Sequence, residues 1–212
     1  MTQLKLNSNG NKGSQPLEID PVAIQRLQEF KECSSCLTPN NDPETASTCW
    51  EAPARGFVKI NSDGAIINET KEIGAAVIAR NELGSCLAWK SCRFPHSDDP
   101  LLAESKAALM AINLALEFNW HNVIFEEDCK NFIERLLSVV EDNSSSGPLV
   151  NDARQLMNSF ATCQVKFIGR ALNFHAHVLA RLAGHMADGS GVFPFDCSIG
   201  VLLSKNKKNL VS

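Results

Sequence analysis

The segment V-K-I-N-S-D-G-A, residues 58–65, decides the fold that this chain can adopt. From Phe57 to Ser62 apolar and polar residues alternate, which predicts a strand, and Asp63-Gly64 predicts the end of that strand. A carboxylate adds nothing to the stability of a strand end, because Asp is among the residues that strands disfavour. Asp63 is therefore the first candidate functional residue of the chain.

The segments that follow predict a mixed α/β domain. The hydrophobic pattern predicts further strands at 73–80, 85–93, 122–125 and 164–168, and helices at 101–118, at 130–140, from Pro148 and at 173–186. The order βββαβααβα, with three strands before the first helix, predicts a five-stranded mixed sheet with helices on its faces. A right-handed crossover would place the first and fourth strands side by side and parallel.

Composition divides the chain into three parts. Residues 1–55 are rich in Asn, Ser, Thr and Pro, and they predict a mostly flexible extension with one short helix from Asp20 to Phe30. Residues 56–187 form the predicted domain. Residues 188–212 form a predicted tail with three lysines between positions 205 and 208, a cluster typical of a solvated tail, with a targeting or nucleic-acid role as the alternative.

Charge and cysteine usage limit the cellular setting and the class of site. The 212 residues carry a formal net charge of −4, so any nucleic-acid binding must be local. The eight cysteines lack the spacing of a disulfide framework, and residues 1–13 contain no apolar signal core, so we expect the cytoplasm or the nucleus. No apolar run reaches the roughly 18 residues of a membrane span, so no membrane contact is expected. The C-x-x-C at Cys33 and Cys36 lacks a fourth zinc ligand, even if Cys49 is the third.

Two more acidic residues occupy positions like that of Asp63. Glu104 falls in the opening turn of the predicted helix 101–118, and Asp128 follows the predicted strand 122–125. Carboxylates about 5 Å apart repel by roughly 3 kcal/mol per pair at an effective dielectric constant near 20, so a cluster of three would be costly or partly protonated without a cation. Mg²⁺ prefers such oxygen ligands, and two ions roughly 4 Å apart can activate water and stabilise the leaving oxygen of a phosphodiester.

Five segments together resemble the type 1 ribonuclease H family, and within it the plant retroelement-derived, reverse-transcriptase-like branch. They are W-E-A-P-A-R-G-F-V-K-I-N-S-D-G-A (50–65), G-A-A-V-I-A-R-N-E-L-G (74–84), A-E-S-K-A-A-L-M-A-I (103–112), F-E-E-D-C (125–129) and G-R-A-L-N-F-H-A-H-V-L-A (169–180). The resemblance implies a ribonuclease H-like fold and two-metal cleavage of the RNA strand of RNA–DNA hybrids. It assigns the first three catalytic, metal-binding positions to Asp63, Glu104 and Asp128, and the fourth to His177.

The fourth position departs from the family pattern. Cellular ribonucleases H carry an aspartate where this chain has His177, and a neutral imidazole suits softer metals better than Mg²⁺, so Mn²⁺ is the alternative ion. The flexible histidine loop of the cellular enzymes is also missing. The linker between the last predicted strand and the last predicted helix consists only of residues 169–172, and His175 comes too late to replace the loop histidine. A catalytically weak or inactive nucleic-acid-binding module is therefore the alternative to the enzyme, and a protein-interaction scaffold is the third interpretation.

Several residues near these motifs have structural interpretations. Glu126 and Glu127 are expected to face away from the site, because the family motif uses the aspartate that follows them. Asp98-Asp99, before the helix, predict its cap. Gly64 either relieves the strand end or lets the backbone approach an RNA 2′-hydroxyl, which makes it the predicted substrate-binding residue.

Overall fold

A six-stranded mixed sheet organises the residues that the computed structural model describes, which are 50–68, 70–95, 97–183 and 189–191. The predicted helix at 20–30, the C-x-x-C pair and the lysines near the C-terminus lie outside the described residues. The strands are β1 (Val58–Ile66), β2 (Ile73–Arg80), β3 (Cys86–Phe94), β4 (Asn122–Glu127), β5 (Thr162–Phe167) and β6 (Gly189–Gly191). The helices are α2 (Pro100–Glu117), α3 (Lys130–Leu137), α4 (Gly147–Met157) and α5 (Phe174–Leu182).

The strand order across the sheet is β5-β4-β1-β2-β3-β6. β1, β2, β3 and β6 pair with one another antiparallel, whereas β4 runs parallel to both β1 and β5. The five predicted strands, the mixed sheet and the parallel pairing of the first and fourth strands are therefore confirmed. β6 was not predicted. It is a three-residue strand that pairs antiparallel with β3 at the edge of the sheet, in a segment that was predicted to be a tail.

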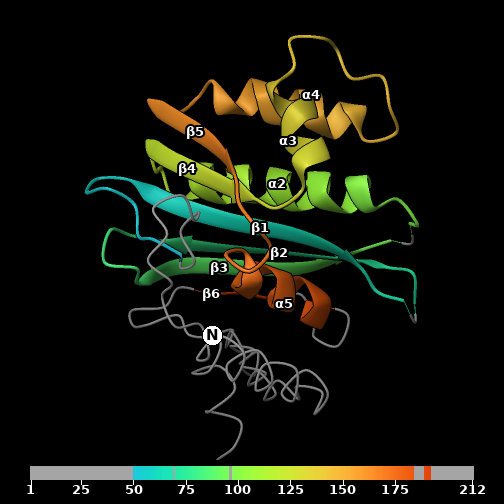
Figure 1. The fold of residues 1–212 in the computed structure, drawn as a ribbon, viewed down its shortest axis with the longest axis horizontal. Coiled ribbons are helices and arrows are strands. Elements are labelled where there is room, and N and C mark those ends of the chain that lie inside the picture. Colours follow the sequence, from blue (N-terminus) through green and yellow to red (C-terminus); the bar gives the residue numbers. More distant parts are fainter. Residues whose placement is uncertain (1–49, 69, 96, 184–188, 192–212) are drawn as a thin grey trace, which may run out of the picture.

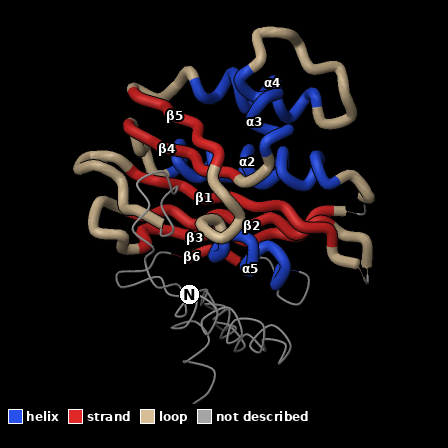
Figure 2. Tube along the Cα trace, in the orientation of Figure 1, coloured by secondary structure: helices blue, strands red, loops and turns tan. Residues whose placement is uncertain are grey.

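Helices cover both faces of this sheet. α2, α3 and α4 lie on one side, and α5 lies on the other (Figures 1 and 2). α2 and α5 both contact β1 and β2, from opposite sides. Successive side chains of β1 therefore point alternately toward the α2 face and toward the α5 face. Among the described residues, no helix is both long enough and apolar enough to cross a membrane.

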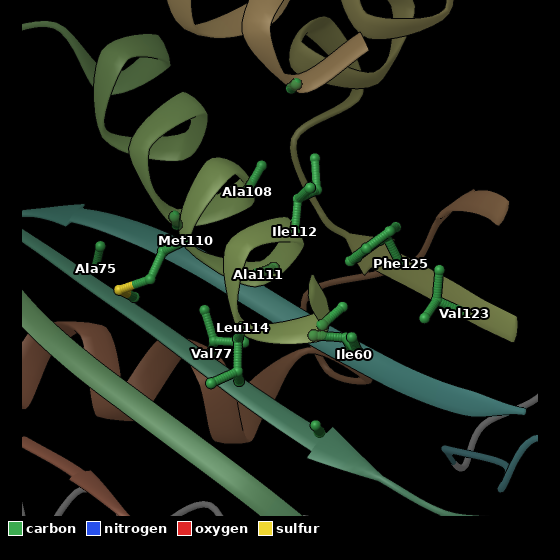
Figure 3. Close-up of a cluster of buried hydrophobic side chains, with 14 of the residues drawn as sticks. Ile60, Ala75, Val77, Ala108, Met110, Ala111, Ile112, Leu114, Val123 and Phe125 are labelled. Carbon is green, nitrogen blue, oxygen red and sulfur yellow. The ribbon is translucent and has the colours of Figure 1, made fainter. Parts of the chain in front are cut away.

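The main hydrophobic core lies between α2 and the sheet (Figure 3). Ile60 of β1, Val77 of β2 and Leu114 of α2 meet there, and each is at most 2% exposed. The alanines of α2 at positions 103, 107, 111 and 115 are all fully buried, and their small side chains allow the helix to lie close to the strands. A smaller cluster on the opposite face includes Ile78 and Leu179, and it packs α5 onto β2.

β1 continues beyond its predicted end, to Ile66, and this corrects the position of the first candidate residue. β2 pairs with β1 from Lys59 to Ile66, with Asp63 opposite Ala76. The parallel partner stops earlier, because the last pair between β1 and β4 is Asn61 with Glu126. Asp63 thus lies inside its own strand but beyond the last residue of β1 that pairs with β4.

Two helix boundaries also differ from the prediction. α2 begins at Pro100, and the carboxylate of Asp99 accepts a hydrogen bond from the backbone N–H of Leu101 at 2.9 Å, which confirms the predicted cap. Glu104 consequently lies in the second turn of α2 and not in the opening turn. α3 ends at Leu137, three residues before the predicted end at 140.

α5 rests on β2 at a glycine. A Cβ atom added to Gly74 would lie 2.1 Å from the carbonyl oxygen of Ala180 and 3.1 Å from the Cβ of Ala183. The absence of a side chain at position 74 therefore sets how closely α5 approaches the sheet, and α5 carries His177.

We expect Gly74→Ala to lower the free energy of unfolding by about 1–3 kcal/mol, because the added methyl group must push α5 away from β2. Urea unfolding followed by far-UV circular dichroism measures the change. Gly169→Ala is the matched control, since a Cβ there meets nothing within 4 Å, and it should shift stability by no more than about 0.5 kcal/mol. Equal urea midpoints for the two variants would contradict this packing argument.

Candidate active site

The fold brings together the three carboxylates that the sequence singled out. One ligand oxygen from each of Asp63, Glu104 and Asp128 can be chosen so that all lie within 4.8 Å of one another. Asp63 comes from β1, Glu104 from α2, and Asp128 from the residue after β4. Asp63 is 1% exposed and Glu104 is 8% exposed, so the cluster is nearly removed from solvent. The arrangement forms because β1 extends beyond its last pair with β4, while α2 packs against both strands.

Gly64 holds Glu104 against the strand. The backbone N–H of Gly64 donates a hydrogen bond to Glu104 Oε2 at 2.9 Å. A Cβ at position 64 would lie 2.2 Å from the carbonyl carbon of Ala103, so only glycine permits this approach of α2. The contact is a structural reason for Gly64 that differs from the relief of a strand end. A contact of Gly64 with a 2′-hydroxyl stays a prediction.

Asp128 is held by two residues of the segment before α5. Asn173 Nδ2 donates to Asp128 Oδ1 at 2.7 Å and to the backbone oxygen of Ser62 at 2.7 Å, so its amide joins the two parallel strands. Arg170 Nε donates to Asp128 Oδ2 at 2.9 Å, while 67% of the Arg170 side chain stays exposed. Neither residue was predicted from the sequence. Both lie in the segment 169–180, but a short linker has no periodicity that shows where its side chains point.

His177 approaches the cluster through Asp63. Its Nδ1 atom lies 3.2 Å from Asp63 Oδ2 and 3.3 Å from Oδ1. The side chain is 22% exposed, so it forms part of the border between the site and solvent. The structure thus brings the fourth predicted residue next to the first. Its role as a metal ligand stays a prediction, because the distance-defined group among the described residues consists of the three carboxylates.

Glu126 and Glu127 lie on opposite faces of β4. Glu126 faces away from the cluster, as predicted: its carboxylate accepts from Lys59 Nζ at 2.8 Å and from Trp50 Nε1 and Asn61 Nδ2 at 3.0 Å each. The prediction is wrong for Glu127, whose carboxyl group lies beside that of Glu104. Strand alternation separates the two side chains, and only the position of α2 decides which of them reaches the site.

Burial and the neighbouring acids raise the pKa values of three carboxyl groups at the site. Burial raises the pKa of Glu104 to about 8, and the charge of Asp63 adds to this shift. Burial also raises the pKa of Asp63 above its ordinary value, although the hydrogen bond from His177 opposes the effect. The pKa of Glu127 is raised well above its ordinary value, first by burial and then by the charge of Glu104. Without a cation, Glu104, Asp63 and Glu127 therefore hold a proton more tightly than ordinary carboxyl groups do.

The donor set fits a hard divalent cation. All three clustered groups are carboxylates, which are the ligands that Mg²⁺ and Mn²⁺ take in phosphate-processing sites. Two buried oxygen atoms beside the cluster, Glu127 Oε1 and Asn173 Oδ1, have no hydrogen-bond partner among the described residues. Buried polar atoms are rarely left in this state, and water or an ion is the usual partner. The site is therefore compatible with divalent metal binding.

Comparison with known proteins supplies the family. The sequence model of the family described as reverse transcriptase-like matches residues 61–183, which is more than half of the chain. No curated protein matches the sequence. The matched range begins just before Asp63 and ends just after α5, so it contains every residue of the cluster described above.

Solved structures of low sequence identity share the fold. Ribonuclease H1 from the archaeon Halobacterium salinarum NRC-1 is 19% identical, with a TM-score of 0.54, over 58% of this chain and 93% of that chain. The N-terminal ribonuclease H domain of a Mycobacterium tuberculosis protein is also 19% identical, with a TM-score of 0.55, over 60% and 92% of the two chains. LC11-RNase H1 in complex with an RNA/DNA hybrid is 17% identical, with a TM-score of 0.51, over 57% and 92%. The chain therefore belongs to the reverse transcriptase-like family, and its described domain has the ribonuclease H-like fold.

Proposed function

We propose that this protein is a metal-dependent endoribonuclease that hydrolyses the RNA strand of RNA–DNA hybrids. The observation that carries the proposal is the meeting of Asp63, Glu104 and Asp128 within 4.8 Å, from three separate elements of a ribonuclease H-like fold. The structurally similar LC11-RNase H1 was solved with an RNA/DNA hybrid, which supports this substrate class. The plant retroelement-derived branch remains part of the hypothesis.

The acidic cluster would hold the metal that this chemistry needs. Asp63, Glu104 and Asp128 are the proposed ligands, with His177 as the fourth, and Mg²⁺ or Mn²⁺ are the proposed ions. Two such ions, when bound, supply an activated water and stabilise the charge that develops on the leaving oxygen. The carboxylates repel one another without a cation, so ion binding relieves an existing cost.

The chain's own groups would prepare the site before substrate arrives. Gly64 and Asn173 hold Glu104 and Asp128 through hydrogen bonds of 2.9 Å and 2.7 Å. Such preorganisation matters because ligands must stay close to their productive positions. Arg170 combines a fixed contact to Asp128 with a largely exposed side chain, so its guanidinium is suited to meet a phosphate oxygen at the border of the site.

A catalytically weak or inactive nucleic-acid-binding module is the second candidate. One observation favours it: both oxygens of Asp128 and both oxygens of Asp63 already have protein partners, from Asn173, Arg170 and His177. Those contacts would compete with a cation. The metal dependence of binding separates the two functions, because hybrid affinity that needs Mg²⁺ or Mn²⁺ supports the enzyme and metal-independent affinity supports the module.

We expect the protein to cleave the RNA strand of a labelled RNA–DNA hybrid in Mg²⁺ or Mn²⁺, and Asp63→Asn to lose this activity by more than about 100-fold. Substituting outer partners of metal ligands already costs 10–100-fold, so loss of a ligand charge should cost at least as much. Thermal unfolding in EDTA is the control for folding, and it should show no loss of stability. Wild-type cleavage that survives in Asp63→Asn would rule out this site as its source.

We expect wild-type activity to be higher in Mn²⁺ than in Mg²⁺, and His177→Asp to shift the preference toward Mg²⁺, because a carboxylate replaces an imidazole beside Asp63. Cleavage rates in each ion measure the ratio. His175→Asp is the matched control, since its side chain points about 200° away from that of His177 around the helix. A metal preference that changes equally in both variants would show that His177 has no specific role in the choice between Mn²⁺ and Mg²⁺.

We expect the metal-free protein to lose stability as the pH rises from about 4.5 to about 8, which are the ordinary and folded-state pKa values of Glu104. Because the folded state binds the proton more tightly than the unfolded state, its stabilising effect is complete below the lower value and disappears above the higher one. Urea unfolding in EDTA across this range measures the slope. Glu104→Gln should reduce the slope, and a metal-free stability that rises with pH would contradict the assignment.

A further inference from the structure

Glu127 is a buried acid in a row of apolar residues. Val123, Phe125 and Glu127 alternate along β4, and the first two belong to the core under α2. The strand pattern would favour a third apolar residue at the end of this row. Glu127 has an ionisable side chain instead, and the residue is only 2% exposed. Buried acids are rarely kept unless they are paired, so its presence needs a reason.

The contacts of Glu127 hold it against the proposed site. Ser62 Oγ donates a hydrogen bond to Glu127 Oε2 at 2.6 Å, which fixes the side chain across the β1–β4 pair. Its carboxyl group lies beside that of Glu104, and the charges of Asp63 and Asp128 also act on it. The second oxygen, Oε1, is buried without a hydrogen-bond partner among the described residues. One oxygen of Glu127 is thus satisfied by the protein, and the other is not.

The neighbouring acid, Glu126, has a structural role in this strand. Glu126 forms a buried ion pair with Lys59 and accepts two further hydrogen bonds, so its charge is matched by groups of the protein. The charged groups that act on Glu127 are instead the acids of the site. Removing a charge of the first kind should destabilise the fold, whereas removing one of the second kind should relieve repulsion.

We propose that Glu127 is a positioning residue that acts through Glu104: it raises the affinity of the site for divalent cations and, by the same charge, lowers the stability of the metal-free protein. The inference rests on the proposed function, because it concerns the same metal site. A buried carboxylate behind a ligand adds negative potential where the cation binds and limits the orientations of that ligand. Without the cation, the same group either repels the neighbouring acids or must take up a proton, and both lower the stability of the folded protein.

Glu127→Gln in the full-length chain tests the proposal. The amide keeps the volume of the side chain and an oxygen that can accept from Ser62, but it removes the charge. We expect the Kd for Mn²⁺, measured by isothermal titration calorimetry, to rise about 10-fold, the lower end of the effect of outer partners. We also expect the midpoint of thermal unfolding in EDTA to rise. A solely structural residue would lower that midpoint and leave the Kd unchanged.

Glu126→Gln is the matched control. It makes the same chemical change one residue away, and it should lower the unfolding midpoint, because Lys59 loses its buried partner, while the Kd for Mn²⁺ stays unchanged. Ser62→Ala is a second test that keeps the charge of Glu127 but removes the donor that orients it. This variant should raise the Kd for Mn²⁺ by less than Glu127→Gln does.

The outcomes separate this inference from the function on which it rests. Wild-type protein that binds no Mn²⁺ would overturn the metal site and the role of Glu127 together. Wild-type protein that binds Mn²⁺, with Glu127→Gln binding equally well, would overturn the inference alone. A Glu127→Gln variant that unfolds at a lower temperature than wild type in EDTA would also overturn it, because the proposed repulsion would then be absent.

Discussion

Repulsion among buried carboxylates at the end of β4 is the constraint on which the rest of this structure depends. Asp63, Glu104 and Asp128 are held close together, and the carboxyl group of Glu127 lies beside that of Glu104. A fold tolerates such a cluster only when fixed donors and tight packing oppose its dispersal. The surrounding features therefore share one physical task, which is to keep acids together that would otherwise separate or take up protons.

The backbone performs much of this task through differences in strand length. β1 pairs with β2 through Ile66, but its pairing with β4 ends at Asn61. At Asp63, β1 is therefore still paired with β2 but is no longer paired with β4. Gly64 then brings α2 to within backbone contact of the same strand, and this contact delivers Glu104. Both carboxylates are positioned by elements of the sheet and its covering helix, and such elements hold geometry more firmly than loops do.

The two faces of β4 carry acids with different roles: Glu126 stabilises the fold on one face, and Glu127 lies beside the proposed metal site on the other. On one face, Glu126 is neutralised by Lys59 and anchored by Trp50, so the acid contributes to a closed polar network. On the other face, Glu127 lies among acids and keeps one oxygen without a protein partner. Adjacent residues of the same type thus have opposite energetic roles. Buried polar groups that stay incompletely satisfied are costly, and they persist where a ligand completes them.

The sequence by itself determined the element order, the mixed sheet and the three acids, because periodicity and the placement of carboxylates are local properties of the chain. It also indicated His177, through resemblance, and the cap at Asp99. Only the tertiary structure decided that β1 runs past Asp63, that Asn173 and Arg170 hold Asp128, and that Glu127 faces the site while Glu126 does not. Those facts depend on the register between β1 and β4 and on the height of α2 above the sheet. Neither quantity is encoded in any single segment, because each results from the packing of elements that are far apart along the chain.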